Sequence, residues 1–421
     1  MNKNKTPQIR FNDYTDDWEQ REFVNVFTYL QNNSLSRAEL SYEHGEVFNI
    51  HYGDILVEFG DCLNVKNDKL PLIKNHGITD KYKSSYLKNG DIIIADAAED
   101  ETVGKCCEIK GLDNELILSG LHTIPCRPAE EFAPGYLGYY MNSNAYHDQL
   151  LPLMQGTKVS SISKSSLRNT SIISPKGINE QEKIGIFFQN LDNLITLHQH
   201  KYDKLGKIKK SMLENMFPKE GENVPKVRFS GFTDTWEQCK LGELSDIVRG
   251  ASPRPIKDPK WFDDKSKVGW LRISDVTEQD GRIRFLEQRI SKAGQEKTRV
   301  LYEPHLLLSI AATVGKPVVN YVETGVHDGF LIFLNPKFNQ EFMFQWFEMF
   351  RPMWQQFGQP GSQVNLNSDL VKNTTIKIPI MEEQEQIGEF LKSIDNLITL
   401  HQHKLEKLKN IKKSCLEKMF I

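Results

Sequence analysis

Four stretches of the sequence combine side chains that could bind nucleic acid. They are KYKSS at 81–85, GTKVSSISK at 156–164, RGASPRP at 249–255 and GSQVNLN at 361–367. Lysine and arginine pair with phosphate, while arginine, glutamine, asparagine and serine can hydrogen-bond to base edges. The residues expected to contact nucleic acid here are Lys81, Lys83, Ser84, Thr157, Lys158, Ser160, Ser161, Arg249, Ser252, Arg254, Ser362, Gln363 and Asn365. An ordinary solvated turn is the alternative for each stretch.

A tetrad of identical sequence, TVGK, occurs at 102–105 and again at 313–316. Because the sequences around the two tetrads differ, the matching lysines indicate a shared role. We predict that Lys105 and Lys316 contact phosphate, and a surface lysine at the end of a strand is the alternative. Neither tetrad is a phosphate-binding P-loop, since no glycine precedes its glycine by five residues.

Two patterns imitate fragments of catalytic sites. Asp96 with Glu108-Ile109-Lys110 imitates the spaced acid and Glu-x-Lys of a metal-dependent nuclease. The run 335–338, Asn-Pro-Lys-Phe, imitates the Asn-Pro-Pro-aromatic motif of adenine methyltransferases, but it lacks the second proline. Patterns this short often arise by chance, so we predict no catalytic residues.

Histidines and cysteines are spaced unfavourably for a metal site. His198 with His200, and His401 with His403, form two His-x-His pairs. Residues two apart on a helix point to nearly opposite sides, so one pair cannot chelate an ion. The six cysteines lack Cys-x-x-Cys spacing and are too few for a disulfide scaffold. We therefore predict no bound metal.

Composition limits the possible classes of protein. The 421 residues are 39% hydrophobic and 26% charged, which fits two or three globular domains. Lysine and arginine number 53 against 56 acidic residues, so nucleic-acid binding would need local basic patches or basic partners. No apolar run approaches 18 residues, and the polar N-terminal segment does not resemble a signal peptide. We expect a cytoplasmic protein without a membrane span.

The elements that must position these residues occur twice in the chain. Residues 191–217 and 394–420 are identical at 20 of 27 positions. The start motif PQIRFNDYTDDWEQ at 7–20 recurs as PKVRFSGFTDTWEQ at 225–238, offset by 218 residues. The chain is therefore two copies of one plan, each with a start motif, a variable body and a long motif.

The long motif is predicted to be helical in both copies. Its apolar and polar seam positions follow the 4-3-4-3 spacing of a heptad repeat, which favours packing of the two helices on each other. The alternative is a single long core helix within a large domain. Leucines 194, 197, 397 and 400 widen the apolar face, so a further partner helix could pack there. The residues expected to pack helix against helix are Leu191, Ile195, His198, Leu205, Ile394, Ile398, His401 and Leu408.

The bodies between the repeated motifs are predicted to be α/β, or α+β, domains. Apolar runs at 91–96 and 305–314 indicate buried strands, and the aromatic run at 135–151 indicates a helix. The predicted boundaries are a first body at 1–178, a helix at 179–217, a linker at 218–224, a second body at 225–381 and a helix at 382–421.

The order of these motifs resembles the DNA-specificity subunit of type I restriction–modification systems. NEQEKIG and EEQEQIG each open a long helix shortly after a proline, Pro175 or Pro379. A Gly-polar loop, a short helix and a strand precede each proline. WEQ near the start of each body and the TVGK tetrads fit as well. The resemblance covers essentially the whole chain.

The resemblance implies a pseudo-twofold protein with two target recognition domains, 1–178 and 225–381. Each would read one half of a bipartite site in double-stranded DNA, and two antiparallel conserved helices would hold the domains apart. Two methyltransferase subunits that methylate adenine at N6, and restriction motor-nuclease subunits, are the implied partners in host defence. S-adenosylmethionine, ATP and Mg would bind those partners, so this chain would have no cofactor and no catalytic role. A coiled-coil adaptor and a degenerate DNA-modifying enzyme are the alternatives.

Overall fold

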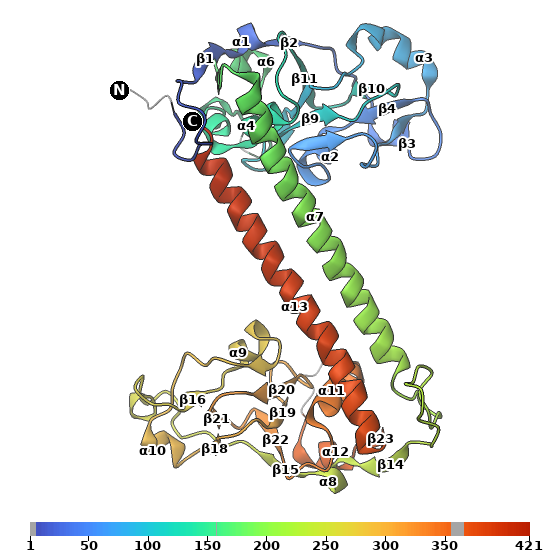
Figure 1. Cartoon of the computed structure of the whole chain (residues 1–421), viewed down its shortest axis with the longest axis vertical. Coiled ribbons are helices and arrows are strands. Elements are labelled where there is room, and N and C mark those ends of the chain that lie inside the picture. Colours follow the sequence, from blue (N-terminus) through green and yellow to red (C-terminus); the bar gives the residue numbers. More distant parts are fainter. Residues whose placement is uncertain (1–5, 157, 355–365) are drawn as a thin grey trace. The chain divides into compact units, whose positions relative to one another are not determined.

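The computed structural model of the chain describes residues 6–156, 158–354 and 366–421 (Figure 1). The chain forms two compact units. Unit 1 consists of residues 1–199 and 403–421, and unit 2 of residues 200–402. The chain therefore passes from one unit to the other twice, and both passages lie inside a long helix.

The two long helices are α7 (Ile178–Asn215) and α13 (Met381–Lys418), each of 38 residues. At 1.5 Å per residue, each is about 57 Å long. In unit 1 the first turns of α7 pack against Phe420, which follows α13, and in unit 2 the first turns of α13 pack against Phe217, which follows α7. The helices are therefore antiparallel within each unit (Figure 1). This confirms the predicted helix pair and excludes a single core helix.

The predicted packing residues of the helices differ in burial. Leu191, Leu205, Ile394, Ile398 and Leu408 lie in the two largest cores. Ile195 is half-buried, as are His198 near the midpoint of α7 and His401 near the midpoint of α13. Leucines 194, 197, 397 and 400, which widen the apolar face, are 43–46% exposed.

A lysine of one helix pairs with an aspartate of the other in both units. In unit 1, Lys412 donates to Asp192, which also accepts a 2.8 Å hydrogen bond from the Tyr139 hydroxyl. In unit 2, Lys209 pairs with Asp395. These residues occupy identical positions of the long motif, so the ion pair accounts for part of the sequence repeat.

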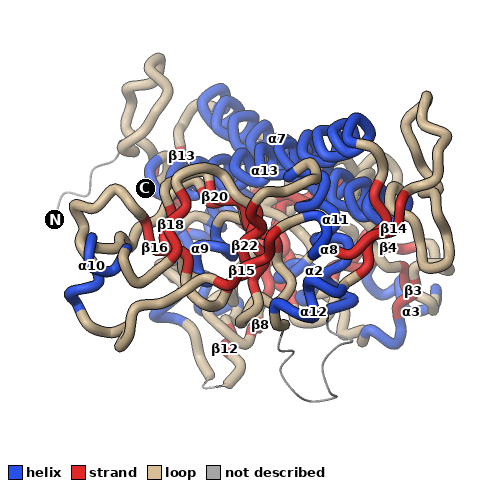
Figure 2. The backbone as a smooth tube through the Cα atoms, turned by 90° about the horizontal axis from the view of Figure 1, so that it is seen from below, coloured by secondary structure: helices blue, strands red, loops and turns tan. Residues whose placement is uncertain are grey.

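Each unit contains one five-stranded sheet, and the two sheets have the same topology. In both, neighbouring strands are antiparallel, except that the last two strands in the orders given next are parallel. In unit 1 the order is β2 (Phe27–Tyr29), β11 (Thr123–Pro128), β7 (Ile92–Ala95), β9 (Cys106–Lys110), β5 (Cys62–Asn64). In unit 2 the order is β15 (Asp246–Arg249), β22 (Phe330–Leu334), β19 (Leu306–Ser309), β20 (Pro317–Asn320), β17 (Arg282–Ile283). Figure 2 labels β15, β22 and β20 of this sheet. The duplication therefore extends to the bodies, whose sequences are dissimilar.

Smaller sheets complete both units. Unit 1 has the sheet β10 (Leu116–Ser119), β4 (Val47–Ile50), β6 (Leu72–Ile73), β3 (Leu40–Ser41), and the pairs β1 (Glu19–Glu22) with β13 (Ser171–Ser174) and β12 (Ser160–Ser161) with β8 (Ala97–Ala98). Unit 2 has the sheet β16 (Gly269–Trp270), β21 (Thr324–Val326), β18 (Arg299–Leu301), and the pair β14 (Glu237–Lys240) with β23 (Thr375–Ile378). The start motif ends in β1 or β14, so both copies use it to pair with the strand before the long helix.

Short helices connect the strands. Those of unit 1 are α1 (Phe23–Val26), α2 (Tyr52–Val57), α3 (His76–Thr79), α4 (Tyr136–Asn142), α5 (Asn144–His147), α6 (Lys164–Leu167) and the 3₁₀ turns η1 (Arg37–Glu39), η2 (Asp80–Ser85) and η3 (Leu151–Leu153). Those of unit 2 are α8 (Leu241–Leu244), η4 (Pro259–Trp261), α9 (Ile273–Glu278), α10 (Lys292–Gln295), α11 (Gln340–Trp354) and α12 (Ser368–Asn373). The single helix predicted at 135–151 is wrong. Ser143 is extended and separates α4 from α5, and its hydroxyl donates to the Tyr140 carbonyl.

Both faces of each five-stranded sheet are buried. In β7, Ile92 and Ile94 belong to the core that includes the long helices, whereas Ile93 and Ala95 belong to the core beside α2. Side chains alternate between the two faces of a strand, so a continuous apolar run is what a doubly covered strand requires. Leucines 306–308 alternate in the same way in β19 of unit 2. The strand predicted at 91–96 is confirmed as β7. The strand predicted at 305–314 is confirmed only over Leu306–Ser309, because the chain bends and turns at 311–315.

The motifs that open the long helices fix each helix to its body. Arg10 donates to both oxygens of Glu180 at 2.7 and 2.9 Å, and Arg228 does the same to Glu383 at 2.7 Å for both. The Gln181 side chain donates to the Pro175 carbonyl, and its counterpart Gln384 donates to the Pro379 carbonyl. The arginine comes from the start motif and the carboxylate from the helix opening. The two motifs therefore recur together because they bind each other.

Candidate nucleic-acid interface

The predicted loops of unit 1 lie at one edge of the five-stranded sheet, where the strands β2 and β7 end. Tyr29 of β2 pairs with Cys126, and Ala95 of β7 pairs with Thr123, so β2 and β7 end at the edge where β11 begins. The chain continues from β7 into β8, which pairs with Ser160 and Ser161. The 156–164 loop is thereby brought to the same edge as the loop that follows β2.

Further contacts join the unit 1 loops at this edge. The Tyr29 hydroxyl donates to the Lys164 carbonyl at 2.7 Å, and the backbone N–H of Gln31 donates to the Ser85 hydroxyl at 3.1 Å. The second bond attaches η2 to the loop after β2. His122 has a left-handed backbone with φ of 54°, and its ring lies 3.1 Å from the Asp96 carboxylate.

The structure places the predicted contact residues of unit 1 on this surface with different exposure. Lys81, Lys83, Ser84, Lys158 and Ser161 are exposed, and Ser160 is half-buried. Lys83 forms an exposed ion pair with Asp80 at 2.9 Å, which is weak enough to exchange for a phosphate. Thr157 lies outside the described residues.

The equivalent edge of unit 2 holds the RGASPRP loop around one aspartate. Arg249 Nε donates to the Asp328 carbonyl at 2.6 Å. The Ser252 hydroxyl and Arg254 Nη2 donate to the two carboxylate oxygens of Asp328 at 2.7 and 2.6 Å. Partial burial alone would raise the pKa of Asp328, but these two donors hold it below its usual value. Asp328 is therefore a charged anchor for a basic loop, and the Arg254 side chain is 70% exposed.

The remaining predicted residues of unit 2 are Ser362, Gln363 and Asn365. They lie outside the described residues.

The TVGK tetrads form turns of the same geometry. The backbone N–H of Lys105 donates to the Thr102 carbonyl, and that of Lys316 to the Thr313 carbonyl, both at 3.0 Å. The glycine of each tetrad has positive φ, 89° in unit 1 and 76° in unit 2, a conformation that glycine adopts without strain. The turn itself therefore accounts for the shared sequence.

The tetrad lysines have partners inside the protein. Lys105 Nζ donates to the carbonyls of Leu56 and Phe59 at 2.9 and 3.1 Å, at the C-terminal end of α2. Lys316 pairs with Asp280 and, at 2.8 Å, with Glu348, and its side chain is 12% exposed. Burial lowers the pKa of Lys105. Burial would also lower that of Lys316, but its two carboxylate partners raise it. A phosphate contact by either lysine, which stays a prediction, would have to displace these partners.

Replacing Lys316 with methionine is therefore expected to affect stability first. The change would leave Glu348 without its cation in a site that is only 16% exposed, at a cost of about 1–3 kcal/mol. Thermal unfolding measures this cost. Lys158→Ala is the control, since Lys158 is exposed and the change should leave the unfolding midpoint in place. Unchanged stability of Lys316→Met with uniformly weaker DNA binding would instead favour the phosphate contact.

The patterns that imitate catalytic motifs have structural roles. Glu108 is buried, and it accepts hydrogen bonds from the backbone N–H groups of Gly135 and Gly138 at the start of α4. It pairs in register with Ile92, whereas Asp96 follows the other end of β7, so the two acids do not share a site. Asn335 forms a left-handed turn and donates to Asp246.

Residues 6–156, 158–354 and 366–421 contain no group of three or more histidine, cysteine, aspartate or glutamate side chains placed to hold a metal ion. In the same ranges, none of the helices is sufficiently long and apolar to cross a membrane.

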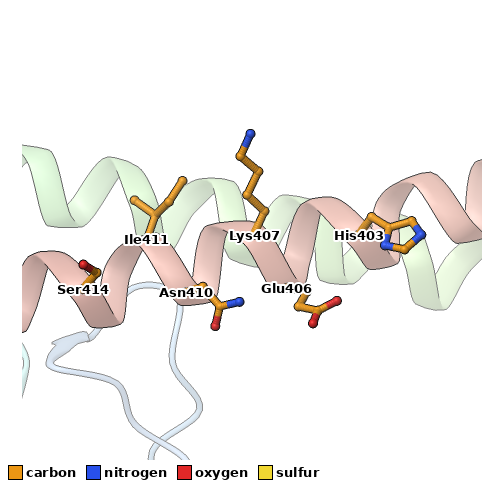
Figure 3. A pocket seen from close by; sticks show the side chains of 6 residues that line it. All are labelled: His403, Glu406, Lys407, Asn410, Ile411 and Ser414. Atoms are coloured by element: carbon orange, nitrogen blue, oxygen red, sulfur yellow. The ribbon is translucent and has the colours of Figure 1, made fainter.

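A depression on α13 differs in chemistry from the sheet edges. Figure 3 shows its lining within unit 1, with Lys407 and Ile411 pointing to one side of the helix and Glu406 and Asn410 to the other. The lining includes the positively charged Lys407 and the negatively charged Glu406 beside the exposed Ile411. Such a mixed surface fits a protein partner better than a polyanion.

Sequence reasoning missed the loop that follows β2. Gln31 and Ser34 are exposed in this loop, at the edge that also holds the predicted 156–164 loop. The signal was present, because the 218-residue offset of the start motifs places Gln31 opposite Arg249. Extending the repeat beyond WEQ would have paired the two loops.

Known proteins share both the sequence pattern and the fold. Residues 16–207 and 233–410 match the type I restriction modification DNA specificity domain. The MjaX specificity subunit, a type I restriction enzyme relative from Methanocaldococcus jannaschii, is 22% identical over 95% of this chain and 92% of its own length. The MjaVIII specificity subunit from the same organism is 25% identical over 62% of this chain and 64% of its own length.

A solved structure has the same fold over its whole length. It is the type I restriction–modification S subunit from M. genitalium, with a TM-score of 0.57 at 14% identity, covering 99% of both chains. A chain from a structural study of complex assembly and conformational transition in a type I restriction–modification system has a TM-score of 0.51 at 17% identity, covering 95% of this chain and 96% of its own.

The repeated motifs and the two sheets of identical topology define a duplicated two-domain protein. The chain belongs to the family of type I restriction–modification DNA-specificity subunits, because the family's domain matches it twice and covers most of its length. It is a DNA-recognition subunit and not a catalytic one. The resemblance noted in the sequence is confirmed.

Proposed function

We propose that unit 1 and unit 2 each read one half of a bipartite site in double-stranded DNA. The observation that carries this proposal is the pair of sheets with identical topology and dissimilar edge loops. Equivalent scaffolds with different side chains at one edge would read different base sequences. Sequencing the methylated positions in cells that express this chain with its methyltransferase tests the proposal. A two-part motif is expected, and a continuous motif would contradict it.

We further propose that two methyltransferase subunits bind the long helices and methylate adenine at N6, and that restriction motor-nuclease subunits join them. S-adenosylmethionine, ATP and Mg would bind to those partners, and the complex would act in the cytoplasm. The exposed leucines support this proposal. Leu194 and Leu197 in unit 1 recur as Leu397 and Leu400 in unit 2, so the chain offers the same apolar surface twice.

Replacing Leu194 and Leu197 with serine is expected to remove one methyltransferase subunit and leave the other. The same change at Leu397 and Leu400 should remove the second subunit, so each double variant is the matched control for the other. Native mass spectrometry of the purified complex counts the subunits. The unfolding midpoint of the isolated chain should stay in place, because these side chains lie at the surface. Retention of both subunits by the variant with all four changes would contradict the assignment.

A further inference from the structure

We propose that the loop after β2 in unit 1 and the loop after β15 in unit 2 distinguish bases. Gln31 of unit 1 would contact an adenine, and Arg254 of unit 2 would contact a guanine. This inference rests on the proposed function, since it takes each unit to read one half of a DNA site. It assigns a preferred base to a named side chain in each half.

Arg254 is held in a defined orientation while most of its side chain faces solvent. Its Nη2 donates to one oxygen of Asp328, whose other oxygen accepts from the Ser252 hydroxyl. The guanidinium has five N–H donors, so this bond leaves donors for a ligand. Guanine presents O6 and N7 together in the major groove, and arginine is the side chain that most often binds both. An arginine already oriented by a carboxylate loses less entropy on binding.

Arg249, in the same loop, is turned towards the protein. Its Nε donates to the Asp328 carbonyl, and its own carbonyl accepts from Arg299 Nε at 2.8 Å. These bonds fix the backbone from which Arg254 projects. Arg249 is therefore assigned a positioning role, and Arg254 the contact with the base.

The unit 1 loop is equally well anchored, but it presents an amide. The backbone N–H of Asn33 donates to the Ser119 carbonyl at 2.8 Å, and its buried side chain donates to Asn49 Oδ1 at 2.7 Å. Two residues earlier, Gln31 is exposed and is tied through its backbone to Ser85. Glutamine binds the N6 and N7 positions of adenine with its two amide atoms.

The two loops occupy equivalent places and differ in the group they expose. Each follows the edge strand, β2 or β15, of sheets with the same strand order. In unit 1 the exposed lysines of η2 adjoin the loop through Ser85, so phosphate binding and base reading can be supplied by neighbouring segments. An amide in one unit and a guanidinium in the other predict half-sites with different preferred bases.

The test uses the assembled complex of this chain with its methyltransferase. The methylated motif of the wild-type complex defines the site. Competition binding to duplexes with each single base-pair change then compares wild type with Gln31→Ala, Arg254→Ala and Arg254→Lys. We expect Gln31→Ala to lower discrimination at one A·T pair of one half-site by roughly 5- to 150-fold, and Arg254→Ala to do the same at one G·C pair of the other half-site.

Arg254→Lys separates base reading from charge. It keeps the positive charge but loses the planar fork, so discrimination at the G·C pair should fall while affinity for unrelated DNA stays close to wild type. Unchanged discrimination at every position in all three variants would overturn the proposal. So would an equal loss of affinity for all duplexes, or relaxation at a pair that lacks the predicted base. A wild-type motif that is not bipartite would instead refute the proposed function.

Discussion

Replacing Phe420 with alanine is expected to destabilise unit 1 by about 3–5 kcal/mol, the usual cost of removing a buried aromatic side chain. Phe420 is 4% exposed, although it is the second residue from the end of the sequence. Its ring stacks on Phe188 with centroids 5.6 Å apart and packs edge-on against Trp18, Tyr136 and Tyr140. It therefore joins the start motif, α4 and α7.

The chain contains a matched control for this prediction. Phe217 occupies the same position of the long motif and packs against Trp236 and Phe342 in unit 2. Hydrogen exchange measures the two units separately. Phe420→Ala should reduce protection in the β1–β13 pair, and Phe217→Ala should reduce it in the β14–β23 pair. Equal loss of protection in both pairs by either variant would show that the units unfold together.

The same packing shows why the units do not follow the order of the chain. The core of unit 1 takes its last aromatic residue from the end of α13, and the core of unit 2 takes the equivalent residue from the end of α7. Each helix thus begins in the core of its own copy and ends in the core of the other. The predicted boundaries at 1–178 and 225–381 enclose the start motif and the body of each copy, whereas each compact unit also includes part of both long helices.

Much of the fold follows from short-range sequence signals. The heptad spacing predicts the long helices, and continuous apolar runs predict strands that are buried on both faces, as β7 and β19 are. The helix break at Ser143 was not predicted, because the aromatic run that contains it has no proline and its two glycines lie immediately before α4 and inside it. A single serine that bonds to a preceding carbonyl was sufficient to end the helix.

The candidate site was harder to predict because the partners of its residues are distant in sequence. Lys105 binds carbonyls 46 and 49 residues earlier, and Arg254 binds an aspartate 74 residues later. Identity between the copies also has a structural explanation. The TVGK tetrads match because both form the same turn, whereas the sheet-edge loops differ in side-chain chemistry. In a duplicated reader of two different half-sites, shared residues indicate the scaffold and unshared residues at equivalent places indicate recognition.

Lengthening both long helices by 21 residues is expected to abolish methylation of the natural site and to create a new site with the same half-sites and a gap about nine base pairs longer. The insertions would follow Lys201 in α7 and its repeat counterpart Lys404 in α13. Three heptads preserve the 3.5-residue seam and add about 31 Å. That is close to one turn of DNA, about 34 Å, so both units would again face the duplex from nearly the same side.

Both helices must be lengthened because the chain passes between the units twice. An insertion in α7 alone would leave α13 at its original length, so one unit would lose the helix end that completes its core. A seven-residue insertion in both helices is the second control. It adds about 10 Å, or three base pairs, which turns the second half-site roughly 100° around the duplex. We expect that variant to fold but to methylate poorly, and sequencing of methylated positions decides between these outcomes. Methylation of the natural gap by the 21-residue variant would show that the helices do not set the spacing.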